Sequence, residues 1–576
     1  MKHRIWSAAF GLAFAAILTV GLAACGDGTV AVESVTLDQN TLSLEVGKTE
    51  TLTATVTPDN ATDKTVTWTT DDAEVATVEN GTVTAVAVGE AVITATAGDK
   101  TATCSVTVTP AVVAADGITL NVSALSLEVG KTGTLTATVT PDNATDKTVT
   151  WTTDNAEVAT VENGTVTAVA VGETVITAKA GDKTATCSIV VANKVLSTAE
   201  DLTAFATAVN GGNKYEGKTV ALGADIDLTD TAWTPIGAYY YGEGTDRAFS
   251  GTFNGNGYAV KGIEWNNVGE TAENEGGLFG YLANATVKNV TVEANIETSG
   301  WAGILAGRAE VSRIIGVTTK GSILGDGASA SVAGLCEYMY GSTATDCVNE
   351  ATVTSKNVSA NSPYAAGISN EVNGSTIENC VNRGAVTLEA PVENKWSICV
   401  GGIAAYMKNG STLSGNTNTA AITVTEGAYC EVGGIVGDVF SESEGENKVI
   451  GNTNNGTVSA TSNDVYVGGI VGAAYAIYSV KIDELSYEYY NNTVTFTGNT
   501  NSGEVIMTPA AEDENGWGYT PCAGGLIGWL EQYSEESFVD DGTNKSSVTP
   551  ENMTEGRGDV KNDYGKQVID FPESNE

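Results

Sequence analysis

The stretch "GNTNNGTV", residues 451–458, decides the fold, because related stretches recur along the C-terminal half of the chain. They are "DCVNEATV" from Asp346, "NCVNRGAV" from Asn379, "GNTNTAAI" from Gly415 and "GNTNSGEV" from Gly498. Their alignment brings five asparagines into one column: Asn349, Asn382, Asn418, Asn454 and Asn501. Stacked coils of short strands place equivalent residues about 4.8 Å apart, so these asparagines can hydrogen-bond along the stack as a ladder. The repeat predicts a β-helix, which we place over residues 195–530.

Glycines form a second repeated element, as in "EVGGIVGDVF" at residues 431–440. The pattern Gly-Gly-apolar-apolar-Gly, or a close variant, returns mostly every 26 to 35 residues, with one gap of 56. A phosphate-binding loop would occur once, between a strand and a helix, and would carry Gly-Lys-Ser or Gly-Lys-Thr. Because this pattern recurs without a following helix, we interpret the glycines as corners of the coils.

A short capping helix is predicted where the β-helix begins. Ser197-Thr198-Ala199-Glu200 is a capping-box signature, "EDLTAFATAVN" follows it, and Gly211-Gly212 ends it. The stretches "YEGKTVALGADIDL", "AWTPIG" and "FSGTFNGNGYAVKGI" come next. Together with the recurrent glycines, they resemble bacterial surface proteins that carry GLUG motifs. The resemblance implies a right-handed parallel β-helix with an adhesive or scaffolding role. Similar modules precede the catalytic part of some zinc peptidases that cut immunoglobulin A, and this chain lacks that part.

Residues 32–109 and 115–192 are two copies of one unit, offset by 83 residues. The stretch "TLTATVTPDNATDKTVTWTTD" begins at Thr51 and again at Thr134. Its alternation of polar and apolar residues, broken by turn residues, predicts a β-sandwich. Both copies resemble bacterial Ig-like domains of group 2, which implies stalk or adhesive modules. We expect Trp68 and Trp151 to plug the two cores, and Cys104 and Cys187 to be buried thiols.

The N-terminus has the chemistry of a secretion signal. Lys2 and Arg4 precede an apolar run from Ile5 to Ala24, which a membrane anchor could also explain. Leu22-Ala23-Ala24-Cys25 resembles the bacterial lipobox, which implies removal of residues 1–24 and lipidation of Cys25. Residues 25–31 would then form a tether. The protein is expected to be lipid-anchored and outward-facing in a bacterial cell envelope, on the cell membrane or the outer membrane.

Charge and composition exclude several classes of function. With 28 basic and 71 acidic residues, the net charge of −43 disfavours nucleic acid as a partner. The only histidine, His3, lies in the segment expected to be removed, which excludes His-dependent triads and His-ligated zinc. We find no ordered calcium loop and predict no catalytic, cofactor-binding or metal-binding residues. We expect a monomer, with residues 531–576 forming a polar acidic tail.

The fold class predicted is all-β: two Ig-like sandwiches followed by a right-handed β-helix with its capping helix. The preferred function is a non-enzymatic adhesin or ligand-binding scaffold that binds an extracellular glycan or a host or matrix protein. The proposed contact residues are Tyr239, Tyr240 and Tyr241, with "SYEYY" (residues 486–490) as a second aromatic site. The alternative is that these tyrosines cover the interior of the β-helix.

Two other functions stay open, a passive envelope spacer and a carbohydrate-active β-helix enzyme. Paired carboxylates can hydrolyse a glycosidic bond without histidine, although no acidic pair stands out in the sequence. Cys347 and Cys380 fall in one column of neighbouring coils, where either a disulfide or a stack of reduced thiols is feasible. Arg557-Gly558-Asp559 resembles the tripeptide that integrins bind, or is part of a solvated tail.

Overall fold

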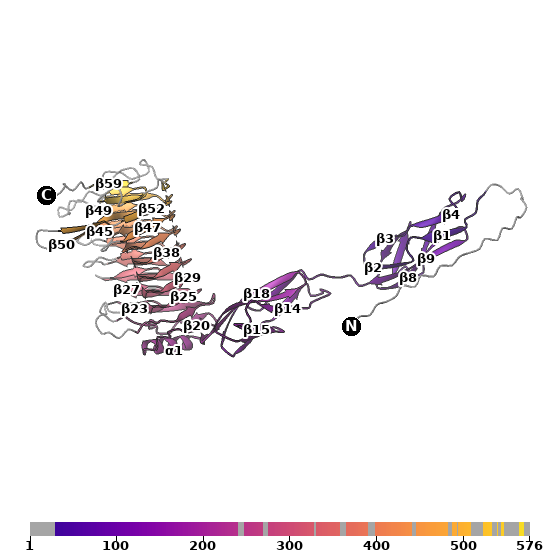
Figure 1. The fold of residues 1–576 in the computed structure, drawn as a ribbon, viewed down its shortest axis with the longest axis horizontal. Coiled ribbons are helices and arrows are strands. Elements are labelled where there is room, and N and C mark those ends of the chain that lie inside the picture. The colour runs from indigo at the N-terminus through magenta and orange to yellow at the C-terminus, as the bar shows by residue number, and fades with distance from the viewer. Residues whose placement is uncertain are drawn as a thin grey trace, which may run out of the picture. The chain divides into compact units, whose positions relative to one another are not determined.

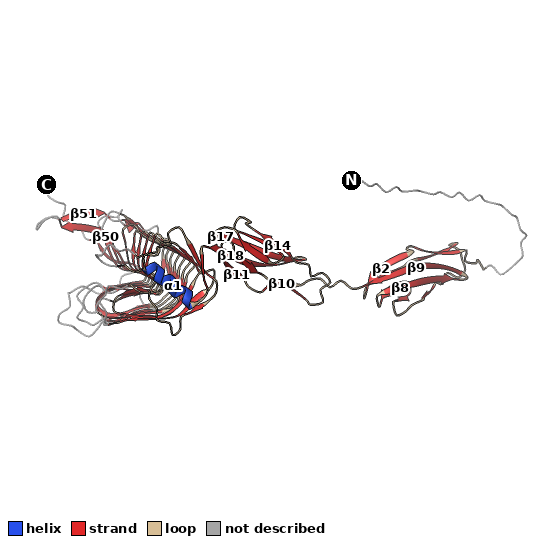
Figure 2. Cartoon of the chain, turned by 90° about the horizontal axis from the view of Figure 1, so that it is seen from below, coloured by secondary structure: helices blue, strands red, loops and turns tan. Residues whose placement is uncertain are grey.

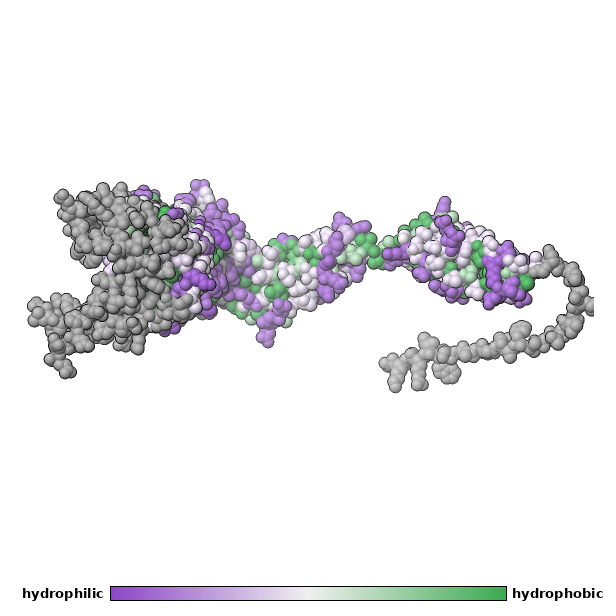
Figure 3. All heavy atoms as spheres, turned by 90° about the horizontal axis from the view of Figure 1, so that it is seen from above, coloured by the Kyte–Doolittle hydropathy of each residue, from purple (hydrophilic) through white to green (hydrophobic). Residues whose placement is uncertain are grey.

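The computed structural model describes residues 29–239, 247–268, 275–327, 330–356, 364–389, 398–440, 445–481, 487–491, 493–508, 522–532, 538–539, 543–546 and 564–568. Contacts divide the chain into two units, one formed by residues 1–117 and 139–148, the other by residues 118–138 and 149–576. Strands dominate both units (Figure 1). Among the described residues, no helix has the length and apolar character needed to cross a membrane. The part of their surface visible in Figure 3 is mainly hydrophilic to neutral.

The first repeat folds as a β-sandwich. Its strands are β1 (Ser34–Leu37), β2 (Thr41–Glu45), β3 (Thr49–Thr51), β4 (Ala54–Thr57), β5 (Thr67–Thr70), β6 (Ala76–Glu79), β7 (Thr82–Ala85), β8 (Gly89–Ala97) and β9 (Lys100–Thr109). They pair in the orders β2-β9-β8-β5, β3-β7-β6 and β1-β4. Leu52, Ile93 and Val106 are buried between the sheets. Trp68 packs against this core but is only half-buried, and Cys104 is a fully buried free thiol.

The second repeat has the same succession of strands. They are β10 (Gly117–Leu120), β11 (Ala124–Glu128), β12 (Thr132–Thr134), β13 (Ala137–Thr140), β14 (Thr150–Thr153), β15 (Ala159–Glu162), β16 (Thr165–Ala168), β17 (Gly172–Ala180) and β18 (Lys183–Ala192). Trp151 packs against the core as Trp68 does. Cys187 is a buried free thiol whose pKa burial raises to about 11. The predicted thiol environments of both sandwiches are therefore confirmed.

Polar contacts attach the second sandwich to the first coils. Asn256 Nδ2 donates a hydrogen bond to Ser126 Oγ at 3.0 Å, and Asn254 Nδ2 donates to Glu173 Oε1 at 2.7 Å. Glu173 also forms an ion pair with Lys288. Both Asn254 and Asn256 are almost fully buried in this junction.

The helix α1 (Ala199–Asn210) lies at the end of the stack of coils (Figures 1 and 2). The side chain of Thr198 accepts a hydrogen bond from the Asp201 backbone at 3.1 Å, and Asp201 Oδ2 accepts one from the Ser197 backbone at 3.0 Å. A capping arrangement is therefore present one residue later than predicted, with Thr198 and Asp201 in place of Ser197 and Glu200. Gly211 is the C-cap, and Phe205 fills the core beneath the helix.

Three long sheets, named here the first, second and third coil sheets, form the coils within the described residues. The first contains β19 (Lys194–Leu196), β20 (Thr219–Leu222), β22 (Thr252–Asn254), β25 (Thr286–Lys288), β29 (Arg313–Ile315), β33 (Thr343–Thr345), β38 (Thr376–Glu378), β43 (Thr412–Ser414), β47 (Glu446–Ile450), β52 (Thr493–Thr497) and β57 (Phe538–Val539).

The second coil sheet contains β21 (Ile226–Asp227), β23 (Ala259–Asn267), β26 (Thr291–Thr298), β27 (Trp301–Gly303), β30 (Thr318–Asp326), β31 (Ser331–Ala333), β34 (Val348–Asn349), β35 (Thr352–Lys356), β36 (Tyr364–Ala366), β39 (Val381–Asn382), β40 (Val386–Glu389), β41 (Ile398–Gly401), β44 (Thr417–Asn418), β45 (Ile422–Gly433), β48 (Thr453–Asn454), β49 (Val458–Gly468), β53 (Thr500–Asn501), β54 (Val505–Thr508), β55 (Cys522–Gly524) and β58 (Lys545–Ser546). The third contains β24 (Phe279–Ala283), β28 (Ala306–Glu310), β32 (Cys336–Tyr340), β37 (Ser369–Asn373), β42 (Ala404–Lys408), β46 (Val436–Val439), β50 (Val471–Lys481), β51 (Tyr487–Asn491), β56 (Ile527–Gln532) and β59 (Tyr564–Val568).

Neighbouring strands of the coil sheets run parallel, whereas β51 pairs antiparallel with β50. Equivalent repeat positions are in register, as when Asn418 of β44 faces Asn454 of β48. One hydrophobic core runs through the coils from α1 onward. This arrangement is consistent with the predicted β-helix. The strands β57, β58 and β59, which follow residue 530, continue the three sheets.

The predicted asparagine ladder is present. Nδ2 of Asn349, Asn382, Asn418 and Asn454 each donates to Oδ1 of the equivalent asparagine in the next coil, at 2.8–2.9 Å. Each of these asparagines is fully buried. Since every member both donates and accepts, the ladder satisfies the polar groups that the core encloses.

A second ladder, two residues before the first, was not predicted. Asn416, Asn452 and Asn499 donate in succession to Asn452, Asn499 and Asn544 at 3.0–3.1 Å. Cys347 and Cys380 occupy the same column in earlier coils and are free thiols. The Cys347 backbone N–H lies 3.4 Å from Cys380 Sγ, and the Cys380 N–H donates to Asn416 Oδ1 at 2.9 Å.

The glycine pattern lies at a corner, as predicted, but for a different physical reason. In "EVGGIVGDVF", β45 ends at Gly433 and β46 begins at Val436, with a bend between them. Neither Gly433 nor Gly434 has a positive φ. A Cβ on Gly434 would instead lie 2.1 Å from the Gly469 carbonyl oxygen and 2.4 Å from Asn454 Cγ. Glycine is required there because the next coil and the ladder approach the backbone so closely.

Candidate functional site at the corner of the coils

Two columns of outward-facing residues flank the glycine corner, and we call them the outer columns. One runs along the second coil sheet and contains Trp301, Ser331, Tyr364, Cys399, Glu431 and Tyr466. The other runs along the third coil sheet and contains Tyr281, Arg308, Tyr338, Glu371, Tyr406, Asp438, Ala473 and Trp529. Within one coil, the two positions are seven residues apart, as in Glu431 and Asp438. Side chains of the two columns contact each other: Tyr364 stacks on Tyr406, and Tyr466 stacks on Trp529.

Arg308 organises the end of the corner nearest α1. Its guanidinium lies between the rings of Tyr239 and Tyr338, 4.2 Å from each centroid. Arg308 Nε donates to Glu310 Oε1 at 2.6 Å, and Arg308 Nη1 lies 3.5 Å from Glu275 Oε1. Cation–π stacking and two carboxylates therefore hold this largely buried cation in place.

Glu275 titrates abnormally in this environment. Burial raises its pKa to about 8, and Arg308 only partly offsets the effect because Glu310 is its closer partner. Burial and the nearby Glu275 also raise the pKa of Glu337 well above its usual range. A buried carboxyl with a raised pKa is typical of functional sites and can donate a hydrogen bond while it is protonated.

A cavity of about 340 Å³ adjoins this cluster. Its lining consists of Asn210, Trp233, Thr234, Pro235, Gly237, Ala238, Arg247, Trp265, Asn267 and Glu275. Trp233 Nε1 donates to the Gly277 carbonyl at 3.0 Å, whereas Trp265 is half-buried. Asn267 Nδ2 and Glu275 Oε2 are buried without a hydrogen-bond partner among the described residues. The cavity thus combines aromatic walls with one unused donor and one unused carboxyl oxygen.

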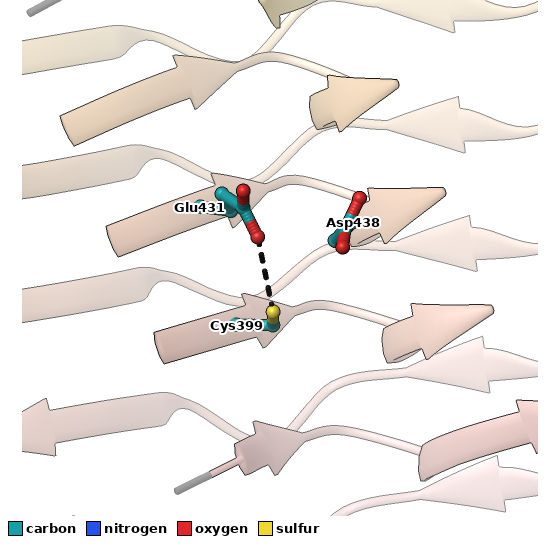
Figure 4. Close-up of side chains that lie close together, drawn as sticks. All are labelled: Cys399, Glu431 and Asp438. Carbon is teal, nitrogen blue, oxygen red and sulfur yellow. Dashed lines mark hydrogen bonds between the residues drawn. The ribbon is translucent and has the colours of Figure 1, made fainter. Parts of the chain in front are cut away.

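A second polar cluster lies farther along the corner (Figure 4). Ligand atoms of Cys399, Glu431 and Asp438 lie within 4.8 Å of one another, and all three residues are buried. Cys399 Sγ is 3.2 Å from Glu431 Oε2. Glu431 Oε1 accepts hydrogen bonds from Tyr429 at 3.1 Å and from Tyr475 at 2.8 Å. Within the described ranges, this is the cluster of cysteine and acidic residues that could hold a metal ion.

Burial and the neighbouring Glu431 raise the pKa of Asp438 well above its usual range. Asp438 Oδ1 has no hydrogen-bond partner among the described residues. Two carboxyl groups this close cannot both carry a charge without a proton or a cation between them. The cluster can therefore share a proton or bind a cation.

Of the predicted contact residues, Tyr239 is the one whose side chain the structure describes, and it lies beside Arg308. Tyr239 stacks on Arg308 and packs edge-to-face on Tyr281, with 5.3 Å between ring centroids. Tyr240, Tyr241, Ser486, Cys25 and Arg557-Gly558-Asp559 lie outside the described residues. Of "SYEYY", residues 487–490 form part of β51, and only their backbone is described.

Sequence reasoning missed Arg308, Glu275 and the cluster of Cys399, Glu431 and Asp438. The signal that could have found most of them is the pair of positions seven residues apart around each glycine motif. Those positions read Trp301 and Arg308, Tyr364 and Glu371, Cys399 and Tyr406, and Glu431 and Asp438.

Comparison with known proteins identifies the two sandwiches. Residues 31–108 and 114–191 match the bacterial Ig-like domain (group 2). The same region is 38% identical over 172 residues to an uncharacterized protein of Clostridium acetobutylicum, covering 28% of this chain and 18% of that protein. It is also 38% identical over 170 residues to the Ig-like virion protein of Serratia phage KSP90, covering 28% of this chain and 66% of that protein.

The crystal structure of the S-layer protein rSbsC is 25% identical, covers 29% of this chain and 28% of that chain, and has a TM-score of 0.16. The matched region thus spans less than two thirds of each of these proteins. The prediction of two bacterial Ig-like domains, made for residues 32–109 and 115–192, is confirmed.

Proposed function

We propose that this protein is a lipid-anchored bacterial cell-surface protein whose right-handed β-helix binds an extracellular glycan without cleaving it. The two Ig-like domains serve as the stalk, and the lipid on Cys25 is the anchor. The domain type and the strongly acidic composition support an extracellular location. The cavity beside Tyr239 carries the proposal for the ligand.

A sugar fits the chemistry of that cavity. The apolar faces of pyranose rings stack on aromatic side chains, and Trp265 offers such a wall. Sugar hydroxyls both donate and accept hydrogen bonds, which suits the unused Asn267 Nδ2 and Glu275 Oε2. Because burying these two atoms without partners costs free energy, a ligand that satisfies both gains affinity.

An enzymatic β-helix has weaker support. The carboxyl oxygens of Glu431 and Asp438 lie within 4.8 Å of each other, near the small separation that retaining glycosidases use. Yet Glu431 is only 2% exposed and Asp438 only 7% exposed, so a glycosidic bond does not fit between them in this structure. A passive spacer, in turn, leaves the unpartnered groups of the cavity without a role.

The test is binding of the unlipidated chain, residues 26–576, to a glycan array with every spot checked for cleavage products. We expect saturable retention without products. Trp265→Ala should weaken binding by about tenfold or more, because one stacking wall is lost. Tyr340→Ala is the matched control, since this aromatic is 50% exposed and does not line the cavity.

Equal loss in both variants, or cleavage products from any spot, would contradict the proposal. Absence of binding to every glycan would favour the spacer. The anchor is tested separately by incorporation of labelled fatty acid in a bacterial host, which Cys25→Ser should abolish.

A further inference from the structure

We propose that Cys399, Glu431 and Asp438 form a binding site for one thiophilic divalent cation, with zinc as the fitting ion. The site goes beyond glycan binding and does not depend on it. It is built from three neighbouring strands: β41 carries Cys399, β45 carries Glu431 and β46 carries Asp438 (Figure 4).

The donor atoms lie close enough together to share one ion. Zinc binds sulfur at about 2.3 Å and carboxylate oxygen at about 2.0–2.2 Å, so its ligand atoms lie about 3.5 Å apart. Cys399 Sγ and Glu431 Oε2 are 3.2 Å apart, and the whole set lies within 4.8 Å. An ion bound there would have three protein ligands, with the fourth position left for water.

An unsatisfied polar atom independently points to a ligand. Asp438 is only 7% exposed, and its Oδ1 has no hydrogen-bond partner among the described residues. Asp438 also makes no ion pair with them. A cation on this oxygen would satisfy it and compensate the repulsion between Asp438 and Glu431.

The surroundings resemble the support that metal ligands receive. Tyr429 and Tyr475 donate to Glu431 Oε1 and leave Oε2 directed to Cys399. Such outer hydrogen bonds fix the orientation of a ligating carboxylate. The thiolate selects zinc over magnesium and calcium, which prefer sets of oxygen ligands alone. Binding would release the thiol proton of Cys399 and any proton on the carboxyl pair to solvent.

The test uses the full chain, kept reduced and stripped of metal with a chelator. One sample is dialysed against zinc directly, and a second sample is unfolded, refolded and then dialysed against zinc. We expect one zinc per chain by elemental analysis. Cobalt(II) should give a thiolate-to-metal absorption band, and excess magnesium or calcium should not displace either ion. Cys399→Ser and Asp438→Asn should each weaken binding at least about tenfold. Cys399→Ser keeps a hydroxyl that can donate to Glu431, and its thermal melt without metal should match the parent chain.

Cys347→Ala is the matched control, because Cys347 is also a buried free thiol and has Cys380 beside it as a second sulfur. It should leave zinc binding and the cobalt band unchanged. The proposal is overturned if the refolded chain retains no zinc, or if Cys399→Ser retains as much as the parent. The first result would leave a carboxyl pair that shares a proton, and the second would indicate loose binding to surface acids. Neither result bears on the glycan array.

Discussion

The interior of the coils and their outer corner are built from the same repeats but follow opposite rules. Inside, five successive coils carry asparagine at the same position, each bonded to the next at 2.8–2.9 Å. Outside, one register column reads Tyr364, Cys399, Glu431 and Tyr466. The first column is uniform and the second is varied, although both stack at the same strand spacing.

The difference follows from what each position must satisfy. A buried amide needs hydrogen-bond partners for both its N–H groups and its oxygen, and in this stack the equivalent amides of the neighbouring coils supply them. A polar side chain at the corner finds unlike partners instead, as Glu431 does in Tyr429 and Tyr475. A column with the same residue in every coil therefore indicates the fold, whereas a column whose residues differ from coil to coil is free to evolve a binding site.

The largest expected effect comes from breaking the uniform column. Asn454→Ala removes bonds to Asn418, Asn501 and Gly456, and leaves a fully buried cavity. We expect the free energy of unfolding to fall by about 3–5 kcal/mol. Asn455→Ala changes the exposed neighbour in the same coil and should stay within about 0.5 kcal/mol. Urea denaturation of both variants measures the difference, and similar losses would show that the ladder does not hold the coils together.

A somewhat smaller effect is expected at the corner glycine that touches the ladder. Gly434→Ala would place a methyl group 2.1 Å from the Gly469 carbonyl oxygen, so backbone and ladder must both move, at about 2–3 kcal/mol. Gly410→Ala is the contrasting variant, because it has a φ of 78° and no neighbour within 4 Å. It should cost only the left-handed conformation, about 1 kcal/mol. If Gly410→Ala loses more stability than Gly434→Ala in the same denaturation experiment, then the left-handed backbone conformation, and not close packing, is the stronger reason for glycine in the coils.

This contrast also explains what sequence could predict. The ladder, the capping helix and the two sandwiches were predicted because each rests on a repeated or local pattern. The second ladder was missed because Cys347 and Cys380 interrupt it in two coils. The corner was missed because its residues differ from coil to coil, so Glu431 and Asp438 look like ordinary surface acids. Only the register of the parallel strands shows that they converge, and Tyr239 reaches Arg308 across 69 positions of sequence.

The last effect, which is smaller per pH unit than the losses expected at Asn454 and Gly434, is the response of the varied corner to pH. Burial raises the pKa of Glu275 from 4.5 to about 8, so between these values the folded chain binds more protons than the unfolded one. The stability from protonated Glu275 is complete below pH 4.5 and is lost as pH rises to about 8, by up to about 1.4 kcal/mol per pH unit. Thermal melts across this range should show a falling midpoint that Glu275→Gln makes flatter, since glutamine stays neutral. Exposed Glu350, whose pKa Lys320 and Arg383 lower, titrates below this range, so Glu350→Gln should leave the slope unchanged. If Glu275→Gln keeps the parent slope, Glu275 is charged throughout and Arg308 compensates its burial in full.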